Sequence, residues 1–443
     1  MIKFNKGQMI KNKFLIVFLI IPFQTFGQKD SLLTIQQAIE ISLKNNFDIR
    51  LSSNLNEQQE NENTLGNAGM LPNVDFDGTY RHSSNSLKQI ISSGENVNSS
   101  GVITTNANVD IGATWTIFDG FKMFNTKKKL SELSLLSNDR LKIQIENTLE
   151  EVIASYYFIV RQDELLKAIK EELLLSEERV KIADRKSNNG SGSKLNWLQA
   201  KTEYNRQKSI QISLETNSAA AKVKLNYLLG RDIEIKFNIE DTVIISYKPT
   251  YDELKKSVVI QNTTLNYYKK NQRIAQLGLE EAKSFRWPVI GVNVDYIYSK
   301  ITNEKGFALL NQTQGFFYGA TVTIPLFHGF TINQQIKNLK LDVAYSDISL
   351  ESVKSKVNAE LYNAWMLFSS NFDLLQLEEQ NIGYAREVLS ISNERYRVGV
   401  SNSIEQREAQ QIFEEAMKRL ADARFNAKIS ETTLRKLNGE LVK

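Results

Sequence analysis

The feature that most constrains this chain is a strand-to-helix junction that occurs twice. Residues 112–121 read Gly-Ala-Thr-Trp-Thr-Ile-Phe-Asp-Gly-Phe, and residues 319–330 read Gly-Ala-Thr-Val-Thr-Ile-Pro-Leu-Phe-His-Gly-Phe. Each copy alternates apolar with small polar residues and then stops at Phe-x-Gly-Phe. About sixty helix-forming residues without proline follow each copy, and so long a helix is unusual in a soluble domain. The chain must therefore fold with a strand leading into a long helix in two places.

The two junctions belong to a tandem duplication of the whole chain. One spacing of 209 residues separates three glycines of the first half from three of the second: Gly120 and Gly329, Gly190 and Gly399, and Gly230 and Gly439. Ahead of the junctions the spacing is 216, as between Pro72 and Pro288. Order and spacing are both kept, which argues against chance. We predict repeat one at residues 28–230, a linker at 231–249 and repeat two at 250–443, each repeat holding a helix, two membrane strands and a long helical hairpin.

The N-terminal residues 1–27 resemble a secretory signal peptide. Four lysines precede an apolar run, residues 14–21, and Gly27 offers a small residue for cleavage. An uncleaved membrane anchor is the alternative, but the apolar run is too short to cross a bilayer comfortably. The whole chain carries +4, so removal of these four lysines leaves a net charge of zero and no support for nucleic-acid binding. The chain has no cysteine, which excludes disulfides, thiolate metal sites and an acylated N-terminal cysteine.

Two strands of about ten residues are predicted in each repeat, with apolar residues on one face and polar or small residues on the other. This length suits strands that cross a bilayer in a barrel. The Ser- and Asn-rich residues 83–105 are predicted to form a solvated loop between the first two strands. A water-soluble sandwich with a half-buried sheet is the alternative. Four membrane strands cannot close a barrel alone, whereas two chains would supply eight and three chains twelve.

Long helices are predicted after each junction. In repeat one, apolar residues recur every three or four positions from Lys122 to about Asn188, and a returning helix runs from Lys194 to Leu229. Repeat two has a rod from about residue 333 to 397 and a return to about residue 437. Ahead of the strands, Thr34 and Thr250 start capping boxes, each opening one helix that runs to about Gly66 and about Lys283 respectively.

The strand end Pro325-Leu-Phe-His-Gly-Phe330 and the hairpin turn Arg395-Tyr-Arg-Val-Gly-Val-Ser-Asn-Ser-Ile-Glu-Gln-Arg-Glu-Ala409, within the two-fold repeat, resemble the TolC-type outer-membrane efflux protein family. The resemblance covers essentially the whole chain after residue 27. It implies an α+β membrane protein: a homotrimer with a twelve-stranded barrel in outer-membrane lipid, to which each chain gives four strands. A long α-helical coiled-coil tunnel would cross the periplasm. The implied partners are a periplasmic adaptor protein and an inner-membrane pump.

The resemblance also points to functional positions at the far ends of the hairpins. The tips that would contact the adaptor are Gly190, Ser191, Gly192, Val398, Gly399, Val400 and Ser401. Just past the second tip, Glu405 and Glu408 match an acidic pair that constricts the tunnel in this family. Three chains would give two stacked rings of three carboxylates, able to favour cations and gate the pore. The alternative is ordinary capping, because Asn402-x-x-Glu405 is a plausible capping box. The repeat-one equivalents, Asn196 and Gln199, are neutral.

Catalytic chemistry has no support in the sequence. The only histidines are His82 and His328, and a turn or interface role is expected for His328. Gly120, Pro325 and Gly329 are expected to turn the chain from barrel to tunnel. We therefore predict no enzyme activity, cofactor or metal, but a passive outer-membrane exit duct of a tripartite efflux or type I secretion system. The rival hypothesis is a non-channel exported coiled-coil protein with a structural or adaptor role.

Overall fold

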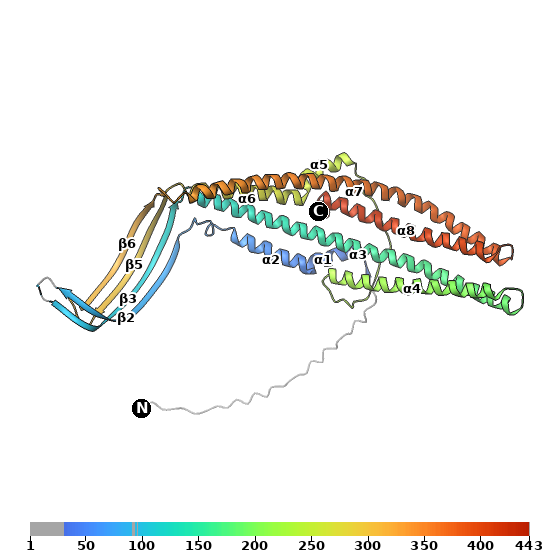
Figure 1. Ribbon diagram of the computed structural model, residues 1–443, viewed down its shortest axis with the longest axis horizontal. Coiled ribbons are helices and arrows are strands. Elements are labelled where there is room, and N and C mark those ends of the chain that lie inside the picture. Colours follow the sequence, from blue (N-terminus) through green and yellow to red (C-terminus); the bar gives the residue numbers. More distant parts are fainter. Residues whose placement is uncertain (1–30, 91–93, 95, 443) are drawn as a thin grey trace, which may run out of the picture.

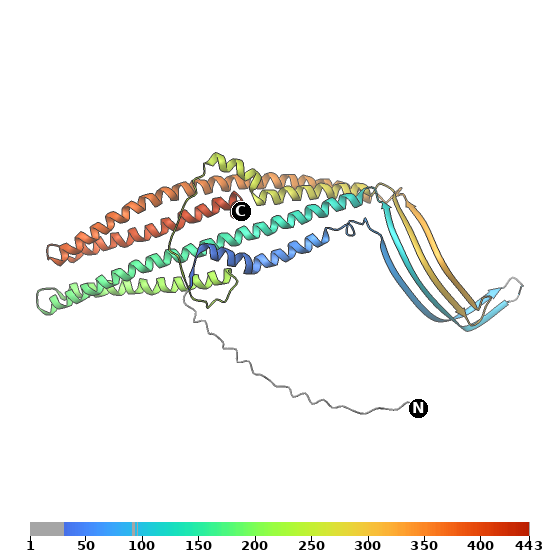
Figure 2. The ribbon, with the colours of Figure 1, turned by 180° about the vertical axis from the view of Figure 1, so that it is seen from behind.

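The computed structural model describes residues 31–90, 94 and 96–442. The protein is elongated, with a β-sheet at one end and the tips of two helical hairpins at the other (Figure 1). Figure 2, from behind, shows the sheet projecting beyond the helices, so that no helix of the described chain covers either face. The signal peptide predicted at residues 1–27 lies outside the described residues.

Four antiparallel strands form the sheet in the order β2-β3-β5-β6: β2 Asn73–Ile90, β3 Asn96–Phe118, β5 Val289–Asn303 and β6 Leu310–Thr323. They contain 18, 23, 15 and 14 residues, so the prediction of about ten each was wrong. The predicted loop at residues 83–105 was also wrong, because Ser84 pairs with Ile103 and the ladder continues to Ile90 opposite Asn96. Backbone pairing between strands does not need apolar side chains, so the strands continue where the sequence pattern fades.

The sheet has one apolar and one polar face, because residues directly opposite one another share a face. Two neighbouring rows across all four strands are apolar: Val74, Ala113, Val294 and Tyr318, then Phe76, Ile111, Tyr296 and Phe316. Between them, the row of Asp75, Gly112, Asp295 and Phe317 points to the other face, so that this row is polar or small except at Phe317. Side chains of these apolar rows are exposed to solvent, with Phe76 68% and Tyr318 84% exposed. The sheet therefore presents to its surroundings a surface that a folded chain normally buries.

Two long hairpins follow the sheet: α3 Lys122–Asn188 with α4 Lys194–Leu228 (hairpin one), and α7 Thr331–Arg397 with α8 Ser403–Leu437 (hairpin two). The two rods have 67 residues each, which at 1.5 Å per residue is about 100 Å. The returning helices have 35 residues each. These bounds confirm the predicted helices to within two residues, because proline-free helical periodicity is a strong signal over such lengths.

Shorter helices lie beside the rods: α1 Ile35–Asn45, α2 Phe47–Glu62, α5 Tyr251–Gln261 and α6 Thr263–Ser284. Both predicted capping boxes, at Thr34 and Thr250, are present. The prediction of one continuous helix after each was wrong, since Asn46 and Asn262 divide them. The linker forms β4 Phe237–Ile239, which pairs in parallel with β1 Ser31–Leu33. The main core lies here, where α1, β1 and β4 pack on α3 and α4.

The helix breaks are built by the two asparagines. The Asn46 side chain accepts hydrogen bonds from the N–H groups of Asp48 and Ile49 at 2.9 and 3.2 Å, and so caps α2. Its amide donates to the Leu228 carbonyl oxygen at 2.8 Å, at the end of α4. Asn262 repeats this arrangement with the Leu437 carbonyl at 2.9 Å. Each break therefore fastens a short helix to the end of a hairpin.

We expect Asn46→Ala to lower the free energy of unfolding by about 2–4 kcal/mol, because it removes a helix cap and leaves the Leu228 carbonyl without its donor. Asn54→Ala, at an exposed position of the same helix, is the control and should stay within about 0.5 kcal/mol of wild type. Denaturant unfolding followed by helical circular dichroism measures both. Equal effects of the two substitutions would contradict the role given to Asn46.

Candidate functional site

The hairpin tips are tight turns that leave small and apolar groups in solvent. In hairpin one, Gly190 has φ of 72°, and Ser193 accepts from the Leu195 N–H at 3.0 Å to begin α4. In hairpin two, Gly399 has φ of 83° and follows the last turn of α7. Ser191, Val398 and Val400 are exposed, whereas Gly192 and Ser401 are half-buried. Both tips therefore offer accessible surface of similar shape.

Glu405 and Glu408 lie in different surroundings, although they are three residues apart on α8. Glu405 pairs with Arg395 of α7 at 3.0 Å, and its N–H donates to the Asn402 side chain at 3.0 Å. Glu408 is exposed and makes no ion pair or hydrogen bond within the described chain. The repeat-one equivalents, Asn196 and Gln199, are exposed. Only Glu408 of the acidic pair therefore carries a charge that no neighbouring cation of the same chain neutralises.

The predicted turns lie where the sheet meets the rods. Gly120 and Gly329 have φ of 71° and 56°, and each precedes a phenylalanine that also has positive φ. Pro325 follows the end of β6 and lies in an open pocket with His328 and Phe330. His82 lies on β2, with Nδ1 2.9 Å from the Thr105 hydroxyl. The two histidines are thus far apart in the fold and belong to different kinds of structure.

A polar cluster that was not predicted from the sequence joins the two hairpins, and we call it the hairpin clasp. Its members come from three helices: Glu172, Ser176 and Arg179 of α3, Glu203, Arg206 and Gln207 of α4, and Gln406, Gln410 and Glu414 of α8. The signal that could have found it is local. Glu172 and Ser176 are buried on the same face of α3 as Ile169 and Leu173, where an apolar stripe should continue.

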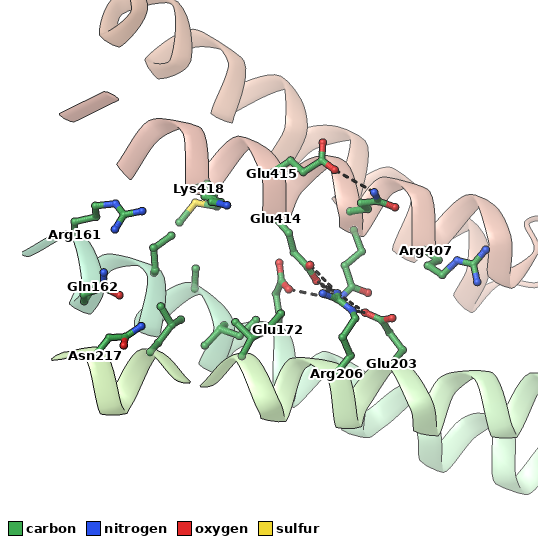
Figure 3. A pocket seen from close by; sticks show the side chains of 18 residues that line it. Arg161, Gln162, Glu172, Glu203, Arg206, Asn217, Arg407, Glu414, Glu415 and Lys418 are labelled. Carbon is green, nitrogen blue, oxygen red and sulfur yellow. Dashed lines mark hydrogen bonds and ion pairs between the residues drawn. The ribbon is translucent and has the colours of Figure 1, made fainter. Parts of the chain in front are cut away.

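Glu172 and Glu414 meet at the centre of the clasp, facing one another from α3 and α8 (Figure 3). The side-chain amide nitrogens of Gln207 and Gln410 each lie 3.5 Å from Oε2 of Glu172. The same two amides donate to Oε1 of Glu414 at 3.1 and 3.0 Å. The two carboxyl groups are close enough for Glu414 to disfavour the ionised form of Glu172. One carboxyl from each hairpin therefore depends on the same pair of donors.

The arginines of the clasp do not bind Glu172. Arg206 holds Glu414 and Glu203, with Nη2–oxygen distances of 2.7 and 2.5 Å. Arg179 donates to Ser176 at 2.8 Å, to Gln406 at 3.2 Å and to Gln410. Glu172 is only 4% exposed. Burial, followed by the neighbouring Glu414 carboxyl, raises the pKa of Glu172 to about 9. The closed arrangement of the clasp therefore favours the protonated form of Glu172.

A groove of about 730 Å³ runs along the clasp between α4 and α8, with α3 as its floor. Leu165, Ile169, Ile210 and Leu214 line its middle. Arg161 lies at the end away from Glu172, where it pairs with Asp422 of α8 (Figure 3). The two hairpins are therefore joined by polar contacts at both ends of a partly open, apolar groove.

The part of the chain that the structure describes contains neither a clustered metal site nor a helical membrane span. No group of three or more histidine, aspartate or glutamate side chains there is arranged to hold a metal ion. No helix there has both the length and the apolar character needed to cross a membrane.

Comparisons with known proteins match nearly the whole chain. A model of the family described as outer membrane efflux protein matches residues 38–231 and 258–440. The toluene efflux pump outer membrane protein TtgC of Pseudomonas putida is 20% identical over 422 residues, which are 91% of this chain and 82% of TtgC.

Solved structures show the same fold. The CmeC outer membrane channel of Campylobacter jejuni superposes with a TM-score of 0.79 at 15% identity, over 92% of this chain and 85% of that one. The outer membrane protein VceC of Vibrio cholerae gives 0.77 at 12% identity, over 91% and 96%. Long helices joined to a β-domain are thus shared with these proteins. Because the family model matches both halves and most of the length, the chain belongs to the outer membrane efflux protein family.

Proposed function

We propose that three copies of this chain form a channel in the bacterial outer membrane, the passive exit duct of a tripartite efflux or type I secretion system. The sheets lie in the membrane and the helices in the periplasm. Residues 1–27 direct export. Residues 28–230 and 250–443 act as two equivalent repeats joined by the linker at 231–249. No step of chemistry on the cargo is assigned to the chain, so energy for transport comes from the partner pump.

The observation that carries this proposal is the uncovered sheet. Its apolar face suits lipid and its polar face, with Asp75 and Asp295, suits a water-filled lumen. β2 and β6 are at its two edges, and each has one neighbour within the chain. Unpaired backbone groups at such edges cost several kcal/mol each in lipid. Three chains joined edge to edge supply twelve strands and remove every edge. Two chains would supply eight, but the resemblance to the TolC-type family favours three.

The helical domain is also incomplete as a single chain. Along α7, several large apolar side chains are exposed although others of the same helix are buried: Leu341, Tyr345, Ile348, Leu367, Tyr384 and Ile391 are the exposed ones used here. Exposed apolar residues along one long helix are typical of a surface that a second chain covers. We propose that neighbouring protomers pack here, so that six long hairpins enclose the tunnel.

The partners are assigned to the tips. We propose that the exposed turns around Gly190 and Gly399 contact a periplasmic adaptor protein, which connects the channel to an inner-membrane pump. Glu408 and Glu405, just past the second tip, are proposed to form the acidic rings that gate the tunnel. TtgC, at 20% identity, is named as part of a toluene efflux pump. An efflux role supports the proposal, and a drug, a metal ion or a protein are each possible cargo classes.

Purified protein in detergent is expected to migrate as a trimer and to conduct ions in planar bilayers. The mass of the complex from light scattering and single-channel recordings measure both properties. The rival function, an exported coiled-coil structural or adaptor protein, leaves the bare apolar rows of the sheet without a role. A water-soluble monomer that never conducts would favour the rival and contradict the channel.

A further inference from the structure

The hairpin clasp contains one more negative charge than its arginines can neutralise. Its three carboxyl groups, Glu172, Glu203 and Glu414, face two guanidinium groups, Arg179 and Arg206. One bound proton makes the cluster neutral. Among the three carboxyl groups, Glu172 is the one expected to bind this proton. It is the most buried of them and has no cation within hydrogen-bond distance in the described chain.

Other charged groups near the clasp do not change this balance. On α7, Tyr396 lies close enough to Arg179 to affect it, and it also receives Lys186 of α3 over its ring at 5.4 Å. On α8, Arg407 and Glu415 line the rim of the groove and are exposed to solvent. Screening by water makes such exposed charges weak neighbours for a buried carboxyl. The state of Glu172 is therefore set by its contacts with Gln207, Gln410 and Glu414.

The clasp holds only while the hairpins are together. Gln410 and Glu414 belong to hairpin two, whereas Glu172 and Gln207 belong to hairpin one. If hairpin two moves away, Glu172 loses both the neighbouring Glu414 carboxyl and the Gln410 donor, and it gains water. Hydration and the loss of Glu414 favour the ionised carboxyl and outweigh the loss of the Gln410 donor, which is the smaller effect. Separation of the hairpins thus moves Glu172 from a site that needs a proton to one that does not.

We propose that each protomer binds one proton at Glu172 when its hairpins are closed, and releases this proton to water when they separate. The proposal rests on the proposed function, because it makes the opening of the periplasmic end of the channel dependent on pH. No bond other than that to the proton forms or breaks, and no partner ion is required. Acid favours the closed hairpins and base favours the separated ones.

The size of the effect follows from linkage. Closed hairpins bind one proton more than separated hairpins at pH values between 4.5, the ordinary pKa of a glutamate, and about 9, the raised pKa of Glu172. In that window the ratio of open to closed protomers increases about tenfold for each unit of pH. Below it both states are protonated, and above it both are ionised, so the ratio becomes constant. A single titrating group per protomer fixes this slope.

The test measures the distance between the two tips as a function of pH. The chain has no cysteine, so Ser191→Cys and Val400→Cys introduce two exposed sites for nitroxide spin labels. Doubly labelled chains are diluted about tenfold into unlabelled chains, so that pulsed electron paramagnetic resonance reports the distance between the two labels of one protomer. We expect the long-distance population to rise between pH 5 and pH 9 at the slope given above. Glu172→Gln, a neutral mimic of the protonated acid, should keep the short distance at every pH.

Three controls make the result specific. Glu171→Gln removes an exposed charge from the neighbouring position and should keep the wild-type pH dependence. Glu172→Met, which cannot ionise or donate, should abolish it as Glu172→Gln does, and circular dichroism verifies that both variants fold. A pH dependence that persists in both Glu172 variants would overturn the proposal, because a group other than Glu172 must then titrate.

Bilayer recordings on the same samples keep this proposal separate from the proposed function. Conducting channels whose tip distance does not change with pH would overturn the proton linkage and leave the channel intact. Trimers that never conduct, but whose tip distance follows the expected slope, would support the linkage and overturn the channel.

Discussion

Gly120→Ala is expected to lower the free energy of unfolding of each chain by about 2–5 kcal/mol. Gly120 has φ of 71°, and a left-handed conformation costs a residue with a side chain about 1–2 kcal/mol. A Cβ atom there would also lie 2.6 Å from the Ser284 carbonyl oxygen and 2.6 Å from Cβ of Trp287. Crowding of that kind adds about 1–3 kcal/mol. The turn from β3 to α3 therefore packs directly against the connection from α6 to β5, and no room is left for a side chain at Gly120.

Gly329 offers a matched comparison from the second repeat. It has φ of 56°, but a Cβ atom there meets nothing within 4 Å of the same chain. Gly329→Ala should therefore cost about 1–2 kcal/mol in the isolated chain, which is the conformational part alone. The spacing of 216 residues makes Ala68 and Leu71 the repeat-one equivalents of Ser284 and Trp287. If the repeat pattern continues from chain to chain, Gly329 meets residues 68–71 of a neighbour in the trimer.

The two substitutions should thus act at different stages. We expect Gly120→Ala to reduce the yield of folded chain, and Gly329→Ala to leave folding largely intact while reducing the fraction of trimer. Denaturant unfolding and the mass of the detergent complex measure these effects separately. Gly278→Ala, in the open interior of α6, is the control and should stabilise by up to about 1 kcal/mol. Equal losses of folding at Gly120 and Gly329 would contradict the difference in packing.

The parts of this fold that follow local rules could be predicted from the sequence. The rods and their returns were placed to within two residues, because their periodicity extends over many turns without proline. The capping boxes at Thr34 and Thr250 are also local features, because each needs only two residues that are three apart in the sequence. The candidate tips also follow from the glycines between two helical patterns, whereas their roles came from the family resemblance.

The features that were missed depend on contacts between distant residues. Asn46 breaks a helix while its side chain binds the Leu228 carbonyl, 182 residues away. The strands continue through residues 83–90 because β3 pairs with them, although their side chains show no apolar alternation. Glu172 and Ser176 interrupt the apolar stripe of α3, but the cluster that they belong to is completed by Gln410 and Glu414 of α8, which are distant in the sequence. Local patterns cannot report a partner that tertiary packing brings in.

Glu408→Gln is expected to weaken the block of ion conductance by Mg²⁺ at the periplasmic end about tenfold or more. Glu408 makes no contact that would neutralise it within the described chain, so the proposed trimer would present three free carboxylates at one level. Each contributes about 1 kcal/mol to a monovalent cation about 4 Å away in water, and salt reduces this value. Loss of three such charges is large compared with the 1.4 kcal/mol that corresponds to a factor of ten.

Glu405 provides the control, provided that its partner is removed with it. Glu405→Gln alone would leave the Arg395 charge unpaired at the tip, and this positive charge would itself repel cations. The double variant Glu405→Gln with Arg395→Gln keeps the net charge and should change the Mg²⁺ block by less than about twofold, since an exposed pair contributes at most about 1 kcal/mol. The half-blocking Mg²⁺ concentration and the reversal potential in a salt gradient measure each variant.

The comparison separates a gate from a helix cap. Glu405 lies in the first turn of α8, where an acid also stabilises the helix by about 0.3–1 kcal/mol through its dipole, and this role needs no pore. Glu408 lies one turn further on, where the dipole effect is weaker, so a purely structural role predicts at most a small loss of thermal stability in Glu408→Gln, with unchanged conductance and block. A gate role predicts the reverse: nearly wild-type stability with weaker cation block and reduced cation selectivity. If the double variant alters block as strongly as Glu408→Gln does, both acids belong to the gate and the ion pair with Arg395 opens in the assembled channel.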